Sequence, residues 1–174
     1  MGRSRAAYNL GMKIFIENEA GTNIKHLYDE QTFALRATHA VARAYPFPYG
    51  FVVGTQSGDG MCLDCFLLTR DDIPSGTVVE AEPIGVLEQI EDGQEDHNIL
   101  AIQPGEHFEL TSAVEAQLKT FVLNVFADVP GKRIAVGRLL DKPAALLLIA
   151  ATRHEAAIST EECLQLTTDN PGRP

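Results

Sequence analysis

The sequence predicts an α+β fold that is mainly β, a barrel or sandwich of short strands followed by two α-helices. Short apolar segments separated by Gly, Pro and Asp turn signals occupy the first two-thirds of the chain. Helical spacing and capping signals dominate the last third. With 174 residues, 45% of them hydrophobic, the chain is expected to be one domain over residues 1–174, with frayed ends at 1–10 and 167–174.

The predicted strands share apolar content and bounding turn residues. They cover residues 11–17, 25–28, 32–35, 50–53, 61–68, 77–82, 84–90 and 99–103. A turn is expected at 28–31, and an acidic loop at 91–96 separates the last two strands. Many short strands joined by turns favour a barrel or a sandwich.

Two helices are predicted after the strands. Ser112 and Glu115 have the spacing of a capping box, and apolar residues then recur at helical spacing up to residue 125. Pro130 and the glycine after it are expected to end this helix. A second helix is predicted to begin at Asp141, with Pro143 in its first turn, and to run through residues 146–158.

Charge and hydropathy exclude several classes of partner. The chain carries 14 Lys and Arg against 24 Asp and Glu, a net charge of −10, which argues against binding nucleic acid. The longest apolar run, residues 144–152, is far shorter than the ~20 residues that span a bilayer, so no membrane partner is expected. There is no apolar signal core near the start, and three cysteines are too few for a disulfide scaffold. A cytoplasmic protein is therefore expected.

Asp64 lies inside the apolar run 61–68 and predicts a functional site. An ionised carboxylate buried there without a partner would cost many kcal/mol, so a cation, a buried Arg or Lys, or a proton must balance it. Asp59 precedes it in a Gly-flanked loop, and Glu91 and Asp96 come from the acidic loop. Oxygen ligands that converge from separate loops are typical of a site for Mg²⁺ or a similar ion. The alternative is that Asp59 caps a turn, Asp64 forms a salt bridge and the acidic loop is merely solvated.

Cationic and phenolic residues supply a second half of such a site. Lys25, Arg36, Tyr45 and Tyr49 fall at strand ends or in loops. Facing a metal cluster, they would form an anion pocket, because a metal-bound phosphate keeps charge for them to neutralise. Each residue alone is more often a surface charge or a core tyrosine, so the hypothesis depends on their combination.

A series of motifs in fixed order carries a resemblance to a known family. They are IK at 24–25, FALR at 33–36, YPFPYG at 45–50, DGMCLD at 59–64, PSGTVV at 74–79, PIGVL at 83–87 and GQED at 93–96. The chain resembles the soluble, metal-dependent (family I) inorganic pyrophosphatases, whose signature D-x-D-P-x-D matches residues 59–64. The likeness covers residues 14–110 and, more loosely, continues to about 150. It implies a small closed OB-like β-barrel of about five strands with two flanking α-helices, and a homo-oligomer.

The resemblance also implies roles for individual residues. The metal ligands would be Asp59, Asp64 and Asp96, with Glu91 at a further metal and Glu17 at a metal that arrives with the substrate. One phosphate would be held by Lys25, Arg36 and Tyr49. The implied cofactor is Mg²⁺, or Mn²⁺ in its place, and the implied reaction is hydrolysis of inorganic diphosphate or a related phosphoanhydride.

The chain departs from the family pattern at several positions. Met61 stands where the family has the aspartate that takes a proton from the attacking water, so no catalytic residue is identified from the sequence. Cys62 replaces the signature proline, Leu27 a glutamate and Asn98 a lysine. The family's late Tyr-Lys pair aligns near Val125 and Phe126.

Three functions are therefore open. Loss of a positioned general base costs on the order of 10²–10⁴ in rate, so a weakened pyrophosphatase is the leading hypothesis. A non-catalytic relative that retains metal and phosphate binding, or serves assembly, is the second. A hydrolase of another phosphoanhydride is the third.

Overall fold

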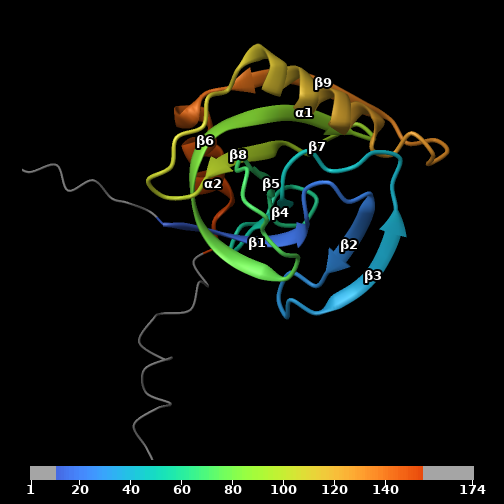
Figure 1. The fold of residues 1–174 in the computed structure, drawn as a ribbon, viewed down its shortest axis with the longest axis horizontal. Coiled ribbons are helices and arrows are strands. Elements are labelled where there is room, and N and C mark those ends of the chain that lie inside the picture. Colours follow the sequence, from blue (N-terminus) through green and yellow to red (C-terminus); the bar gives the residue numbers. More distant parts are fainter. Residues whose placement is uncertain (1–10, 155–174) are drawn as a thin grey trace, which may run out of the picture.

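The computed structural model describes residues 11–154, and Figure 1 shows their arrangement. Five strands form a closed ring in the order β1-β4-β5-β8-β6 and back to β1. They are β1 (Met12–Asn18), β4 (Tyr49–Val52), β5 (Asp64–Leu67), β8 (Asn98–Ile102) and β6 (Thr77–Glu91). Neighbours are antiparallel except β5 and β8, which run parallel. The expected closed, mainly β barrel is confirmed, whereas the frayed ends predicted at 1–10 and 167–174 lie outside the described residues.

The remaining elements surround this barrel (Figure 1). They are β2 (Ile24–Tyr28), β3 (Leu35–Ala40), β7 (Gln94–Glu95), α1 (Ser112–Asn124), β9 (Ile134–Leu140) and α2 (Lys142–Thr152). The strands β2 and β3 form a separate two-stranded sheet, whereas β7 and β9 add to the end of β6. None of the helices in residues 11–154 combines the length and apolar character that crossing a membrane would need.

The strand β6 is a single 15-residue element where the sequence predicted two strands. It continues through Pro83 because the pairing with β8 bulges between Pro83 and Gly85, and a bulge tolerates the missing proline N–H. A Cβ on Gly85 would lie 2.7 Å from the Leu140 carbonyl oxygen, so the close approach of β9 requires glycine here. The length of β6 lets it pair with β1, β8, β7 and β9 in turn.

The prediction of a strand at residues 32–35 is wrong, because a local turn precedes β3 at these positions. Asp29 Oδ1 accepts the backbone N–H groups of Gln31 and Thr32, at 3.1 and 2.8 Å. Phe33 follows in the left-handed region with φ 57°. Asp side chains that bond nearby N–H groups compete with the extended backbone, so β3 begins only at Leu35.

The helices begin close to their predicted positions and end earlier. The N-cap of α1 is Thr111, whose side chain accepts the Val114 N–H, so the capping box predicted at Ser112 is one residue too late. This helix ends at Asn124 and turns follow it, before the proline expected to stop it. Asp141 caps α2 as predicted, but α2 ends at Thr152 because Arg153 is extended. The strand β9 between the helices was not predicted at all.

Both faces of β5 are buried, against different helices. Cys65 and Leu67 belong to the core cluster that includes α2, whereas Phe66 belongs to the cluster that includes α1. Alternation along a strand therefore puts Asp64 on the face toward α1. The strand is shorter than the predicted 61–68, because Met61 lies in the preceding loop with 52% of its surface exposed.

Candidate active site

A cavity of about 340 Å³ opens where the barrel, the β2–β3 hairpin and α1 meet. It is lined by every site residue predicted from the sequence, which are Glu17, Lys25, Arg36, Tyr49, Asp59, Asp64, Glu91 and Asp96. Met61, which stands where the resemblance implies a catalytic aspartate, also lines it. The barrel therefore brings these residues together in one pocket, although they are spread over most of its strands and loops.

Strand pairing explains how the polar groups reach one face. Asp64 on β5 pairs with Asn98 on β8, and Asn98 pairs in turn with Leu87 on β6. Gln89 lies two residues beyond Leu87, and because alternate residues of a strand share a face, Gln89 lies on the same face of β6 as Leu87. All three polar residues line the pocket.

Gln89 is a buried amide that connects the acidic groups, and sequence analysis missed it. Its Nε2 donates to Asp96 Oδ2 at 2.8 Å and to Glu91 Oε2 at 3.4 Å. Its Oε1 accepts from Asn98 Nδ2 at 2.7 Å. Only 6% of Gln89 and 1% of Asn98 are exposed. The available signal was a polar residue inside the apolar stretch 84–90.

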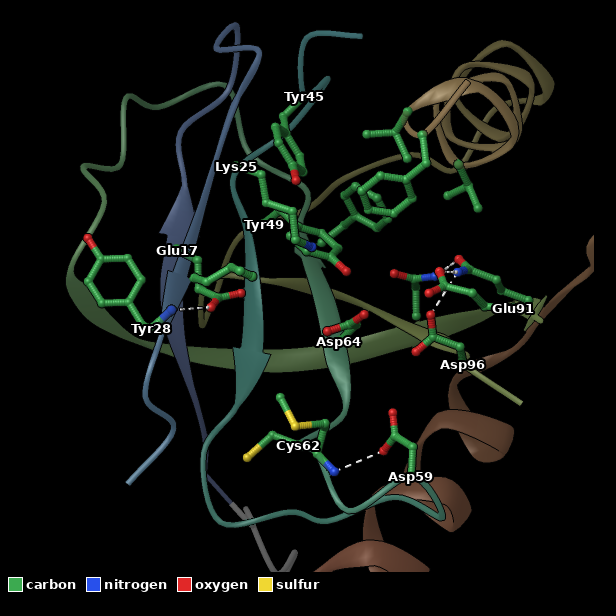
Figure 2. A pocket seen from close by; sticks show the side chains of 18 of the residues that line it. Glu17, Lys25, Tyr28, Tyr45, Tyr49, Asp59, Cys62, Asp64, Glu91 and Asp96 are labelled. Atoms are coloured by element: carbon green, nitrogen blue, oxygen red, sulfur yellow. Dashed lines mark hydrogen bonds between the residues drawn. The ribbon is translucent and has the colours of Figure 1, made fainter. Parts of the chain in front are cut away.

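The carboxylates of Asp59, Asp64 and Asp96 point into the same space (Figure 2). Burial raises the pKa of Asp64 to about 6, an effect that Lys25 and the Tyr49 hydroxyl partly offset. Burial and the charges of Asp64, Glu91 and Asp59 raise the pKa of Asp96 to about 7. The ion pairs of the described residues do not include Asp64, so no arginine neutralises it. The pocket is a site of unbalanced negative charge.

Asp59 also has a local structural task. Its Oδ1 accepts the Ser57 hydroxyl at 2.6 Å and the Met61 backbone N–H at 2.9 Å, the second of which is drawn in Figure 2. The turn-capping interpretation of Asp59 is therefore correct, and the same carboxylate also lines the pocket.

The acidic groups do not form a finished metal cage. Across residues 11–154, no three His, Cys, Asp or Glu side chains gather closely enough to hold a metal ion as they stand. Glu91 forms an ion pair with Lys132, whose Nζ also lies 3.6 Å from Asp92 Oδ2. The sequence analysis missed Lys132, because nothing in the sequence around Lys132 or Glu91 indicates that the two residues form an ion pair. Glu91 is thereby neutralised by the chain itself, unlike the three aspartates.

Glu17 contributes a further buried carboxylate from β1. Its Oε1 accepts the Tyr28 backbone N–H at 3.3 Å, as Figure 2 shows. Burial raises the pKa of Glu17 to about 7, although Lys25 opposes this. Glu17 and Lys25 thus share the pocket.

The expected phosphate-holding residues differ in their surroundings. Lys25 Nζ lies 5.8 Å from the centre of the Tyr49 ring and 5.3 Å from that of Phe126. Tyr49 is buried, and burial together with Asp64 raises the pKa of its hydroxyl. Arg36 lies at the rim, where its guanidinium bonds Asp29 at 2.6 Å and 62% of its side chain is exposed.

One wall of the pocket is apolar. It is formed by Phe121, Val122, Val125 and Phe126, at the end of α1 and in the turn after it. The wall includes the two positions near which the family's Tyr-Lys pair aligns, so no charged or phenolic group faces the pocket from there. The cavity is therefore lined by acidic groups and by this apolar wall.

Comparisons with known proteins agree on one family. A model of the inorganic pyrophosphatase family matches residues 14–154. The inorganic pyrophosphatase of Saccharolobus solfataricus is 36% identical over 93 residues, 52% of this chain and 54% of that one. That of Mycoplasma genitalium is 28% identical over 165 residues, covering 90% of this chain and 84% of its own.

Solved structures show the same likeness. An inorganic phosphatase from Anaplasma phagocytophilum superposes with a TM-score of 0.76 at 25% identity, over 84% of this chain and 94% of that one. The inorganic pyrophosphatase of Helicobacter pylori gives 0.75 at 25% identity, over 82% and 91%. The match spans about half the length of some curated relatives, such as that of Saccharolobus. Because the family model covers most of the chain, the chain belongs to the inorganic pyrophosphatase family.

Proposed function

We propose that the pocket binds Mg²⁺, or Mn²⁺ in its place, together with inorganic pyrophosphate, and hydrolyses the phosphoanhydride bond with weakened turnover. The observation that carries this proposal is the meeting of Asp59, Asp64 and Asp96 with Lys25 in one cavity. The aspartates suit a hard cation and the lysine suits a phosphate, so the two halves of the pocket match a metal-bound phosphoanhydride.

The donor set fits a hydrated divalent cation. Mg²⁺ usually keeps several waters and binds proteins through one or two carboxylates together with substrate phosphates, so a loosely gathered group of aspartates suffices. A cation there would relieve the mutual repulsion that contributes to the raised pKa of Asp96. When bound, such a metal neutralises phosphate charge and lowers the pKa of a coordinated water.

The chain's own cations and hydroxyls would hold the substrate. Lys25 supplies a positive charge in the same pocket as the aspartates. The Tyr49 hydroxyl would donate a hydrogen bond to the substrate, because its raised pKa keeps it protonated. Arg36 would exchange Asp29 for a phosphate at the rim, a bidentate partner that suits a guanidinium equally well. These three residues would thereby orient one end of the substrate.

Weakened turnover follows from the groups that are missing. Met61 cannot accept a proton, and a general base that is lost without a replacement costs on the order of 10²–10⁴ in rate. A missing charged stabiliser at Val125 and Phe126 costs roughly another 10²–10³. The two losses do not simply multiply, because groups that act together are not additive.

The apolar wall also supports two other functions. A non-catalytic protein that retains metal and phosphate binding would show Mg²⁺ and phosphate binding by calorimetry without turnover. A hydrolase of another phosphoanhydride would use Val125 and Phe126 to contact an organic group, and nucleotides and polyphosphates test this directly.

Location in the cytoplasm, the homo-oligomeric state and the single domain over residues 1–174 stay predictions from the sequence.

Phosphate release from pyrophosphate with Mg²⁺ tests the proposed function. We expect Asp64→Asn to lower the rate at least about tenfold, because even groups that merely support a metal ligand cost 10–100-fold. Asp72→Asn is the matched control, since Asp72 is exposed and away from the pocket. Equal rates for the wild-type protein and Asp64→Asn would refute pyrophosphate hydrolysis at this site.

A further inference from the structure

Glu30 is a carboxylate in the pocket that neither the sequence motifs nor the proposed function uses. It lies in the turn between β2 and β3 and lines the same cavity as the aspartates. Its two carboxylate oxygens lie 3.1 and 2.9 Å from the Cys62 backbone nitrogen, whose N–H they accept. Cys62 directly follows Met61, so Glu30 is held beside the position that lacks a carboxylate.

The surroundings leave Glu30 able to accept a further hydrogen bond. The ion pairs among residues 11–154 do not include it, so no lysine or arginine neutralises its charge. A carboxylate has about four acceptor sites, and the Cys62 backbone N–H and the neighbouring Cys62 thiol, whose pKa Glu30 helps to raise, occupy only part of that capacity. Its charge also contributes to the raised pKa of both Glu17 and Asp64, which places it within electrostatic range of these two acids.

We propose that Glu30 is the general base of this pocket and replaces, from a different loop, the carboxylate that Met61 lacks. This inference rests on the proposed function. In the step, a Glu30 oxygen takes a proton from water while the water oxygen bonds one phosphorus of pyrophosphate. The bond from that phosphorus to the bridging oxygen breaks, and its electron pair leaves on the second phosphate. The proton on Glu30 then passes to solvent.

The anchoring of Glu30 makes this assignment physically specific. A flexible glutamate would spend most of its time away from the reacting water, whereas a hydrogen bond to the backbone of residue 62 restricts the carboxylate to one region. General bases must lie within hydrogen-bond reach of the proton they remove. Asp29 also restrains the backbone directly after Glu30, because its side chain accepts the N–H groups of Gln31 and Thr32.

Glu30→Gln separates proton acceptance from loop anchoring. The glutamine carbonyl can still accept the Cys62 N–H, but the amide cannot take a proton. We expect kcat for pyrophosphate with Mg²⁺ to fall on the order of 10²-fold, with KM and calorimetric Mg²⁺ affinity nearly unchanged. The matched control is Glu19→Gln, because Glu19 also accepts a distant backbone N–H, that of Ser75 at 3.1 Å, but lies outside the pocket.

A rescue experiment completes the test. Met61→Asp puts a carboxylate where the signature has one, so we expect it to restore turnover in the Glu30→Gln background. Wild-type kcat in Glu30→Gln would overturn the role of Glu30 and leave the proposed function standing. The role is also overturned if Glu19→Gln loses as much activity, if Mg²⁺ affinity falls with kcat, or if Met61→Asp restores nothing.

The same variants distinguish failure of the inference from failure of the proposed function. If the wild-type protein is inactive and Met61→Asp is active, the pocket hydrolyses pyrophosphate once supplied with a base, and Glu30 is not that base. If neither protein releases phosphate, the inference and the proposed hydrolysis fall together.

Discussion

At the scale of single residues, Gln89 supports two of its polar neighbours in the pocket by hydrogen bonds. Gln89 and Asn98 are almost fully buried, and Gln89 donates to Asp96 and accepts from Asn98. The amide nitrogen of Gln89 thereby stabilises the ionised form of Asp96, and its amide oxygen gives the Asn98 side chain a hydrogen-bond acceptor. A buried polar group costs little only while such partners remain, so Gln89 supports the acidic cluster without itself carrying charge.

Replacing Gln89 by leucine tests this dependence. Gln89→Leu removes the donor to Asp96 and the acceptor of Asn98, so we expect the free energy of unfolding to fall by about 1–3 kcal/mol. Urea denaturation measures the change. The control Gln117→Leu alters an exposed glutamine on α1 and should stay within about 0.5 kcal/mol of the wild-type protein. Equal stability of both variants would show that Gln89 does not support the cluster.

Sequence reasoning identified the pocket residues whose local context is itself anomalous. A charge in a long apolar run required an explanation, and this singled out Asp64. Glu30 gave no such signal, because it is an acidic residue in a polar turn and its partner Cys62 lies 32 residues away. Lys132 meets Glu91 only after β9 pairs with β6. Contacts created by strand pairing between distant segments cannot be read from local spacing.

At the scale of whole elements, α1 carries the apolar wall of the pocket and depends on its first turn. The Thr111 hydroxyl accepts the Val114 N–H at 3.2 Å and satisfies one of the free donors at the helix start. We expect Thr111→Ala to lower the free energy of unfolding by about 1 kcal/mol, as typical N-caps do. Chemical denaturation measures it. Ser112→Ala is the control, and a larger loss from Ser112 would assign the cap to the residue predicted from sequence.

The elements that were predicted wrongly have two physical causes. Local signals found the starts of both helices to within one residue, and most strands, because caps and apolar runs act over a few residues. Pro83 predicted a break in β6, but its bulged pairing with β8 tolerates the proline. The Asp29 turn overrode the extended preference of residues 32–35. Tertiary pairing and turn chemistry decided these cases.

Over the whole molecule, closure of the barrel brings several carboxylates together in one pocket, and the chain already carries a net charge of −10. The carboxylates that gather there include that of Glu17, which is buried, and those of Asp64 and Asp96, which are half-buried, and desolvation raises each pKa above its ordinary value. The cost of burying these charges opposes folding, and a bound cation would remove much of it. The site is thus expected to be a burden on stability until a cation occupies it.

This burden predicts how the stability of the metal-free protein depends on pH. The three folded-state pKa values, about 7, 6 and 7, lie above ordinary values of 4.5, 3.8 and 3.8, so the folded protein binds protons more tightly than the unfolded chain. The protonated forms of these three acids therefore stabilise the fold, an effect that is complete below about pH 4 and is lost as pH rises through about 7. Thermal unfolding in EDTA should therefore show Tm falling between pH 4.5 and 7.5.

Two comparisons isolate the pocket in this measurement. Asp64→Asn removes one of the titrating acids and should flatten the fall, whereas Mg²⁺ added at pH 7.5 should raise Tm in the wild-type protein more than in Asp64→Asn. The ion pair of Glu88 with Arg138 acts in the opposite direction, because it lowers the pKa of Glu88 to about 2 and its stabilisation is lost only below about pH 4.5. A Tm that stays level or rises from pH 4.5 to 7.5, equally in both proteins, would mean that the pocket does not hold buried, unbalanced carboxylates.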